Sequence, residues 1–104
     1  VTRADFCLGD RDGSTCAPEF TDFVAAELRV MGYSTVINDP FKGVELVRMT
    51  GVPADNRHSL QIEINRHLIL NDETKEKAAD FNSLRTNVTK LIGKICDYAK
   101  SKVS

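Results

Sequence analysis

The chain has 104 residues, a length that suits one small domain with a modest hydrophobic core. Hydrophobic residues make up 41% and charged residues 28% of the sequence, a globular composition that argues against disorder. The 14 basic and 15 acidic residues give a formal net charge of -1, which lacks the positive charge typical of nucleic-acid binding. No apolar run approaches the roughly 20 residues that span a bilayer, so we expect neither a nucleic-acid nor a membrane partner.

The cysteines indicate the redox environment. Cys7, Cys16 and Cys96 are odd in number and far apart in the sequence. No pair of them has the short spacing of a zinc knuckle or a redox motif. We therefore expect free thiols and a cytoplasmic location.

The first part of the chain predicts a strand and a helix. The apolar run at 4–8 suits a short buried strand, and the polar segment 9–15 is rich in turn residues. A helix is expected to begin at 16–18, because a proline there suits the first helical turn. An apolar stripe at helical spacing then continues to Gly32, which we expect to end the helix.

The rest of the chain predicts two more strands and two more helices. Residues 33–37 are β-branched and aromatic and predict a second strand, whereas 43–50 suits a short helix. A third strand is predicted at 58–66. The last helix is expected to be capped by Asn71 or Asp72, and its apolar residues recur at helical spacing.

This alternating order of strands and helices predicts an α/β fold. We expect a three-layer helix–sheet–helix arrangement around a mainly parallel or mixed sheet, with right-handed crossovers. Three strands make a thin sheet for such an arrangement. We therefore interpret residues 1–104 as a single α/β unit that forms the C-terminal portion of a larger catalytic domain.

The third predicted strand carries a row of polar side chains. Because side chains alternate along a strand, one face is apolar and the other is polar. Strands of a covered parallel sheet are usually apolar on both faces. An exposed face explains the polar row, and the pattern alone favours this interpretation. The alternative is an active-site cleft in which Glu63 takes a proton from water. The polar row consists of Gln61, Glu63 and Asn65.

The loop after the first strand carries Arg11. Ligands of open α/β sheets bind at the carboxyl ends of strands, and a guanidinium group can hold a substrate carboxylate in a fork. A solvated arginine in an Asp/Gly turn explains the residue equally well.

His58 opens the third strand and could reach a cleft. His58 and His67 are separated along one strand and form no short ligand pair, so the chain has no metal-site signature of its own.

Three segments together resemble one known family. They are Asp-Phe-Cys-Leu-Gly-Asp-Arg-Asp-Gly-Ser-Thr-Cys at 5–16, Asn-Asp-Pro-Phe-Lys-Gly at 38–43 and His-Ser-Leu-Gln-Ile-Glu-Ile-Asn-Arg at 58–66. In this order and with these gaps they are similar to the N-formylglutamate amidohydrolase family. The similarity extends from about Ala4 to the start of the last helix.

The resemblance implies a hydrolase that acts on a linear amide bond of a small N-acyl amino acid. The family converts N-formyl-L-glutamate and water to formate and L-glutamate in histidine degradation. Its fold and catalytic logic are similar to the zinc carboxypeptidase class, a phosphorylase/hydrolase-like fold in which zinc polarises the scissile carbonyl. By strand position Glu63 resembles the general base. Arg11 and Arg66 are candidates for binding substrate carboxylates, and His58 and Asn65 are further candidates for substrate binding.

The same resemblance places the zinc ligands upstream of this chain. The missing N-terminal part of the same protein is then an expected partner, and the 104-residue chain alone is expected to be inactive. A homo-oligomer is also compatible with the pattern. Two other functions stay open: a non-catalytic α/β interaction module, and a related amidohydrolase that acts on another N-acyl amino acid.

Overall fold

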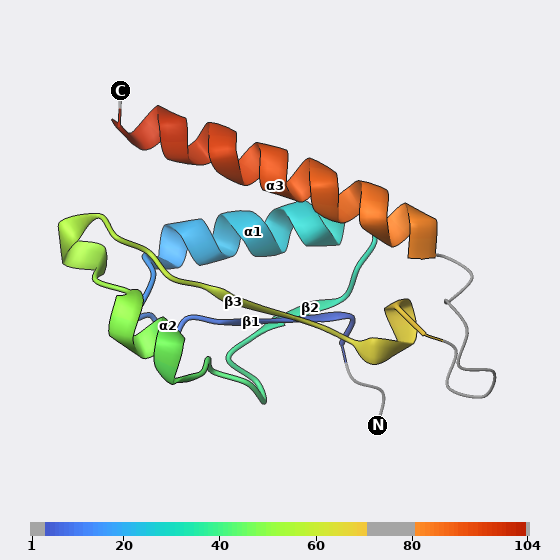
Figure 1. The fold of residues 1–104 in the computed structure, drawn as a ribbon, viewed down its shortest axis with the longest axis horizontal. Coiled ribbons are helices and arrows are strands. Elements are labelled where there is room, and N and C mark those ends of the chain that lie inside the picture. The colour runs from blue at the N-terminus through green and yellow to red at the C-terminus, as the bar shows by residue number, and fades with distance from the viewer. Residues whose placement is uncertain (1–3, 71–80, 104) are drawn as a thin grey trace. The chain divides into compact units, whose positions relative to one another are not determined.

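The computed structural model describes residues 4–70 and 81–103, which belong to two compact units that divide between Asn65 and Arg66. The predicted order of elements is confirmed (Figure 1). The predicted cap of the last helix at Asn71 or Asp72 lies outside the described residues. The elements are β1 (Phe6–Gly9), α1 (Pro18–Val30), β2 (Thr35–Ile37), α2 (Glu45–Thr50), the 3-10 helix η1 (Pro53–Asp55), β3 (Gln61–Ile64), the 3-10 helix η2 (Arg66–Leu68) and α3 (Phe81–Val103).

The sheet of the first unit is mixed and has β1 at its centre. The strand order is β2-β1-β3, with β1 parallel to β2 and antiparallel to β3. The third strand predicted at 58–66 was too long, since β3 is limited to Gln61–Ile64. Its first predicted residues bind the loop after β1 instead: the backbone N–H of Ser59 donates to the Thr15 carbonyl oxygen at 2.8 Å.

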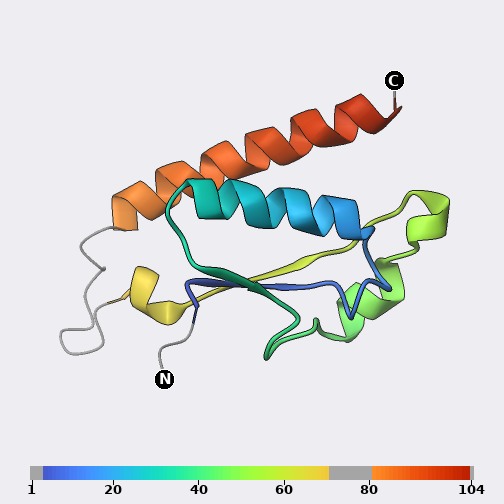
Figure 2. The same ribbon diagram turned by 180° about the vertical axis from the view of Figure 1, so that it is seen from behind.

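The core of the first unit lies between the sheet and α1. Helix α1 covers one face of the sheet in both views of the ribbon (Figures 1 and 2). Phe6 and Leu8 of β1 are 1% and 0% exposed, and Val24 and Leu28 of α1 are equally inaccessible. The apolar stripe predicted for this helix is therefore the surface that it buries. The predicted three-layer arrangement goes beyond this unit and stays a prediction.

Helix α1 ends as its sequence predicts. Its C-cap is Met31, and Gly32 follows with a φ of 97°, which a residue without a Cβ atom adopts readily. At the other end of the helix, Pro18 occupies the first turn, where its missing N–H leaves no helical hydrogen bond unmade.

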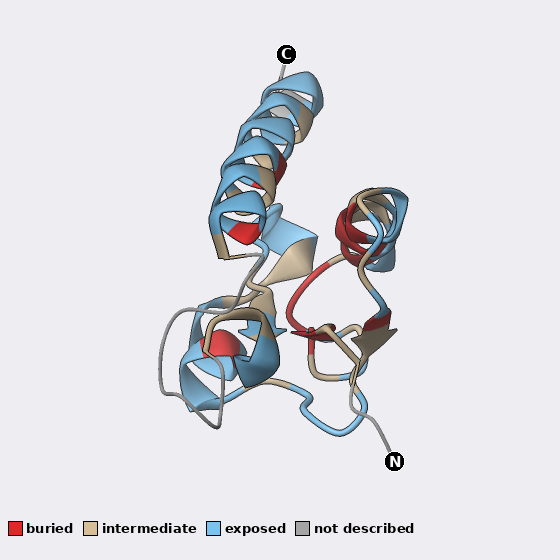
Figure 3. Ribbon diagram, turned by 90° about the vertical axis from the view of Figure 1, so that its right-hand side faces the viewer, coloured by how far each residue is buried: buried red, intermediate tan, exposed pale blue. Residues whose placement is uncertain are grey.

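The second unit contains η2 and the long helix α3. Leu84 and Leu91 of α3 are buried, at 5% and 2% exposure, whereas most of the helix surface is exposed (Figure 3). None of the helices in the described residues combines the length and the hydropathy of a membrane span. All three cysteines are free thiols, as predicted: Cys7 and Cys16 are buried and Cys96 is exposed.

A close backbone approach at Gly9 brings the segment at 42–43 onto the end of β1. A Cβ atom at Gly9 would lie 2.7 Å from both the Gly43 nitrogen and the Lys42 carbonyl carbon. Gly43 itself has a φ of 114°, which also favours glycine. Two glycines therefore allow the chain after β2 to pack directly against the strand end.

We predict that Gly9→Ala destabilises the fold by about 2 kcal/mol or more, because the added methyl group would displace backbone rather than a flexible side chain. Gly93→Ala is the matched control, since a Cβ atom at Gly93 in α3 meets nothing within 4 Å. Alanine also favours helix over glycine by about 1 kcal/mol, so this control should unfold at the same or a higher denaturant concentration. Equal urea midpoints for Gly9→Ala and the unmodified chain would contradict the close approach.

Candidate functional site

The buried carboxylate of Asp10 organises the chain at the carboxyl end of β1. Asp10 is 3% exposed, and its Oδ1 accepts hydrogen bonds from Asn38 Nδ2 at 2.7 Å and from the Gly13 N–H at 2.8 Å. Its Oδ2 accepts from Thr21 Oγ1 at 2.7 Å. Burial opposes ionisation, but the hydrogen bonds from Asn38, Thr21 and Gly13 outweigh it and hold the pKa of Asp10 below its ordinary value. The charged carboxylate thus joins α1 and the end of β2 to the loop after β1.

This loop holds Arg11 in an uncommon backbone conformation. Arg11 and Asp12 have φ angles of 49° and 60°, in the left-handed region that side chains other than Asn and Asp rarely occupy. The Arg11 N–H donates to the Lys42 carbonyl oxygen at 2.7 Å, which stabilises the turn. Backbone strain that the surrounding structure maintains in this way is concentrated at functional sites.

The Arg11 side chain is also directed by the chain after β2. Its Nη1 donates to the Gly43 carbonyl oxygen at 2.9 Å. A guanidinium group has five N–H donors, so this contact orients the group and leaves most of its donors for a ligand. The sequence predicted that Arg11 follows the first strand, but not this contact, because Gly43 is 32 residues away.

Glu63 lies in the middle of β3 with an exposed side chain. It is opposite Cys7 of β1, and Gln61 is opposite Gly9. Gln61 Nε2 donates to Glu63 Oε1 at 3.4 Å, and Gln61 Oε1 accepts from the backbone N–H of Val44 at 3.1 Å. The sequence did not single out Gln61 as a site residue, although its place in the polar row was the available signal.

His58 and Asn65 are engaged within the first unit. His58 Nδ1 accepts from the backbone N–H of Ala17 at 3.0 Å, and its Nε2 lies 3.2 Å from Asn56 Oδ1. These contacts favour a role in holding the start of α1. Asn65 Nδ2 donates to the Ala4 carbonyl oxygen at 3.2 Å, at the amino end of β1. Strand β1 (Phe6–Gly9) lies between this contact and the turn that holds Arg11. The substrate-binding roles of both residues stay predictions.

Arg66 begins η2 in the second unit, and its side chain is exposed. Its carbonyl oxygen accepts from Ile69 and Leu70 at 2.9 and 3.0 Å, which closes the turn.

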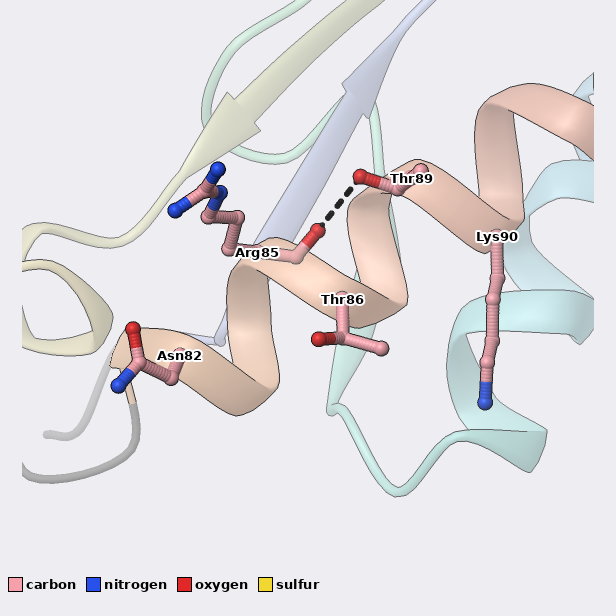
Figure 4. A pocket seen from close by; sticks show the side chains of 5 residues that line it. All are labelled: Asn82, Arg85, Thr86, Thr89 and Lys90. Carbon is pink, nitrogen blue, oxygen red and sulfur yellow. Dashed lines mark hydrogen bonds between the residues drawn. The ribbon is translucent and has the colours of Figure 1, made fainter.

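The same unit contains a shallow hollow on α3 in which Thr89 Oγ1 donates to the Arg85 carbonyl oxygen at 2.9 Å (Figure 4). This hollow offers two cations and no carboxylate, so it does not suit general-base chemistry. It is lined by Asn82, Arg85, Thr86, Thr89 and Lys90.

The residues described by the structure do not form a metal centre. Among them, no three His, Cys, Asp or Glu side chains converge in a way that could hold an ion. The buried Cys16 thiol is also unsuited to metal binding, because burial raises its pKa and disfavours the thiolate. The described residues therefore offer no set of ligands for a zinc ion.

Comparisons with known proteins agree on one family. The family model for N-formylglutamate amidohydrolase matches residues 1–70. N-formylglutamate deformylases from Pseudomonas putida and Pseudomonas aeruginosa are 41% and 37% identical over 63 and 65 residues, each match covering 58% of the chain. A crystal structure of N-formylglutamate amidohydrolase from Ralstonia eutropha JMP134 superposes on 98% of the chain with a TM-score of 0.91 and 45% identity. The chain spans 23% of each deformylase and 36% of the crystallised protein.

We predict that ionised Asp10 makes the fold sensitive to acid. Because the pKa of Asp10 is lowered by folding, its stabilisation is complete above the ordinary aspartate pKa of about 3.9 and is lost as the pH falls through the lower folded-state value. Asp10→Ala should lower the free energy of unfolding at pH 7 by about 3 kcal/mol, because three donors lose their acceptor and the hydroxyl of Thr21 among them is buried.

Asp10→Asn keeps the shape of the side chain and should flatten the decline of stability between pH 5 and pH 2, at a smaller loss at pH 7. Asp12→Asn is the matched control, since the Asp12 side chain is 63% exposed and pairs with Lys42 at the surface. Urea unfolding across this pH range measures the free energy of unfolding of both variants. A steep acid decline that survives in Asp10→Asn would show that other groups cause it.

Proposed function

Because the chain belongs to the N-formylglutamate amidohydrolase family, we propose that it is part of a hydrolase that cleaves N-formyl-L-glutamate to formate and L-glutamate. One observation carries the proposal beyond the family match. The exposed carboxylate of Glu63 is held by an oriented amide, and that amide also binds the segment that directs Arg11. The candidate base Glu63 and the cationic side chain of Arg11, which can bind a carboxylate, are thus connected through Gln61 and the backbone at 43–44.

In the proposed reaction Glu63 is the general base. Its carboxylate takes a proton from water while the water oxygen attacks the formyl carbon. The carbon–nitrogen bond then breaks, and the departing amine nitrogen takes up a proton that Glu63 returns. The products are formate and L-glutamate. The middle position of Glu63 in a paired strand suits this role, because the strand limits the movement of the carboxylate.

Arg11 is proposed to bind a carboxylate of the substrate. N-formyl-L-glutamate has two carboxylates, and a guanidinium group can bind one of them through two parallel hydrogen bonds. The Gly43 carbonyl oxygen and the strained turn fix the direction of the guanidinium before substrate arrives. Arg66 is kept as the candidate for the second carboxylate.

We propose zinc dependence for the complete catalytic domain of this family. The described residues contain no ligand set that fits a metal ion. We propose that the ligands lie in a part of the family domain that this chain does not span. The carboxypeptidase-like fold and the role in histidine degradation are proposed on the same family basis, and the cytoplasmic location is proposed on the basis of the free thiols.

The proposed partner is the remainder of the same catalytic domain. Helix α2 exposes Leu46 and Met49, each at 68%, and these are apolar side chains that such a contact could cover. Self-association stays a prediction. Activity toward other N-acyl amino acids is the alternative within the same chemistry, and substrate profiling of the whole protein distinguishes it.

We predict that Glu63→Gln lowers kcat by about 10² to 10⁴ in the whole protein, because Gln retains the shape of the side chain but cannot accept the proton. KM for N-formyl-L-glutamate should change little, since the carboxylate acts mainly in the transition state. Glu19→Gln is the matched control, an exposed glutamate in the first turn of α1. Steady-state kinetics and a thermal melt are the measurements. A variant with wild-type kcat would remove Glu63 from the mechanism.

We predict that Arg11→Gly raises KM about tenfold or more without loss of the fold, because glycine accepts the left-handed φ of 49°. Arg11→Lys should be intermediate, since lysine keeps the charge and loses the fork. Arg57→Ala is the control for charge alone, because Arg57 is a largely exposed arginine that pairs with Asp55. If KM rises equally in Arg57→Ala, general electrostatic attraction explains the effect and Arg11 has no specific role.

A further inference from the structure

The amide group of Gln61 has one defined orientation. A backbone N–H can only donate, so the Val44 N–H at 3.1 Å requires the oxygen of the Gln61 side chain on that side. The NH₂ group then points the other way and can only donate. It lies 3.4 Å from Glu63 Oε1, which as a carboxylate oxygen can only accept. Donors and acceptors are therefore matched at both ends of the amide.

The strand register explains why Gln61 reaches this position. Gln61 is opposite Gly9, and residues directly opposite one another in a sheet point to the same face. A Cβ atom at Gly9 would meet the Lys42–Gly43 backbone, so that segment lies on the same face. Residues two apart on a strand also share a face, which places Glu63 there with Gln61. Gln61 thus lies between the 42–44 segment and Glu63.

We propose that Gln61 is a positioning residue that sets the orientation of the Glu63 carboxylate relative to the Arg11 side chain. Gly43 accepts from the Arg11 guanidinium, and the next residue donates to Gln61. A movement of the 42–44 segment therefore acts on both the guanidinium and the carboxylate. This inference rests on the proposed function, because it requires Glu63 to be the base.

The two hydrogen bonds of Gln61 can be separated by substitution. Gln61→Glu is isosteric and keeps an acceptor for the Val44 N–H, but it replaces the donor to Glu63 with a second carboxylate. Gln61→Leu removes both contacts. If Gln61 acts through Glu63, both variants should lower kcat about tenfold or more, while KM stays within about twofold. If Gln61 only anchors the 42–44 segment, Gln61→Glu should retain wild-type kcat, and that result would overturn the proposal.

A double-mutant cycle in the whole protein completes the test. In the Glu63→Gln background, Gln61→Glu should cause no further loss of kcat, because the group that Gln61 orients no longer takes the proton. Losses that multiply would show that Gln61 acts independently of Glu63, and would also overturn the proposal. Thermal melts identify any variant that fails to fold, and the isosteric Gln61→Glu keeps the test available if Gln61→Leu does.

The controls separate this inference from the proposed function. Wild-type kcat in Glu63→Gln alone would reject Glu63 as the base, and the role of Gln61 would be rejected with it. A large loss in Glu63→Gln together with wild-type kcat in Gln61→Glu would reject only the role of Gln61. Turnover of N-formyl-L-glutamate is the readout in each arm.

Discussion

The buried charge of Asp10 is the constraint on which the arrangement of the candidate site depends. A carboxylate that is 3% exposed needs donors on each oxygen, and here they come from three separate segments. Thr21 brings α1, Asn38 brings the end of β2, and Gly13 brings the turn that contains Arg11. No apolar residue could bind these three donors, because an apolar side chain has no hydrogen-bond acceptor. The charge therefore fixes the positions of polar backbone at the end of β1.

A second constraint acts at Gly9, the residue before Asp10, and is steric. Gly9 has no side chain, so the Lys42–Gly43 backbone packs on the strand and supplies oxygens for the N–H and the guanidinium of Arg11. The hydrogen bonds to the Asp10 carboxylate stabilise the turn, and the packing of the Lys42–Gly43 backbone against Gly9 stabilises it as well. Together they offset a left-handed conformation that costs about 1–3 kcal/mol for an ordinary residue. Electrostatic and steric constraints thus act on the same side chain.

The sequence predicted the elements well because local patterns determine them. Alternation identified the polar row that includes Glu63, and helical spacing identified the buried stripe of α1. The sequence did not determine the direction of strand pairing, since an alternating pattern is the same for parallel and antiparallel strands. The contacts that join Asp10 to Thr21, Gln61 to Val44 and His58 to Ala17 span 11 to 41 positions, so no local pattern contains them. An Asp in a turn-rich loop looks solvated in the sequence, and only the tertiary structure shows it as a buried acceptor.

The antiparallel direction of β3 decides which polar residues can act together. In an antiparallel pair the start of one strand meets the end of the other, so Gln61 lies at the end of β1 from which Arg11 projects. Asn65, at the other end of β3, binds Ala4 near the beginning of β1. A parallel third strand would have reversed this arrangement and placed Asn65 nearest the turn. The polar row is one feature in the sequence. Strand direction assigns Asn65 to a contact near the beginning of β1 and leaves Gln61 and Glu63 available for chemistry.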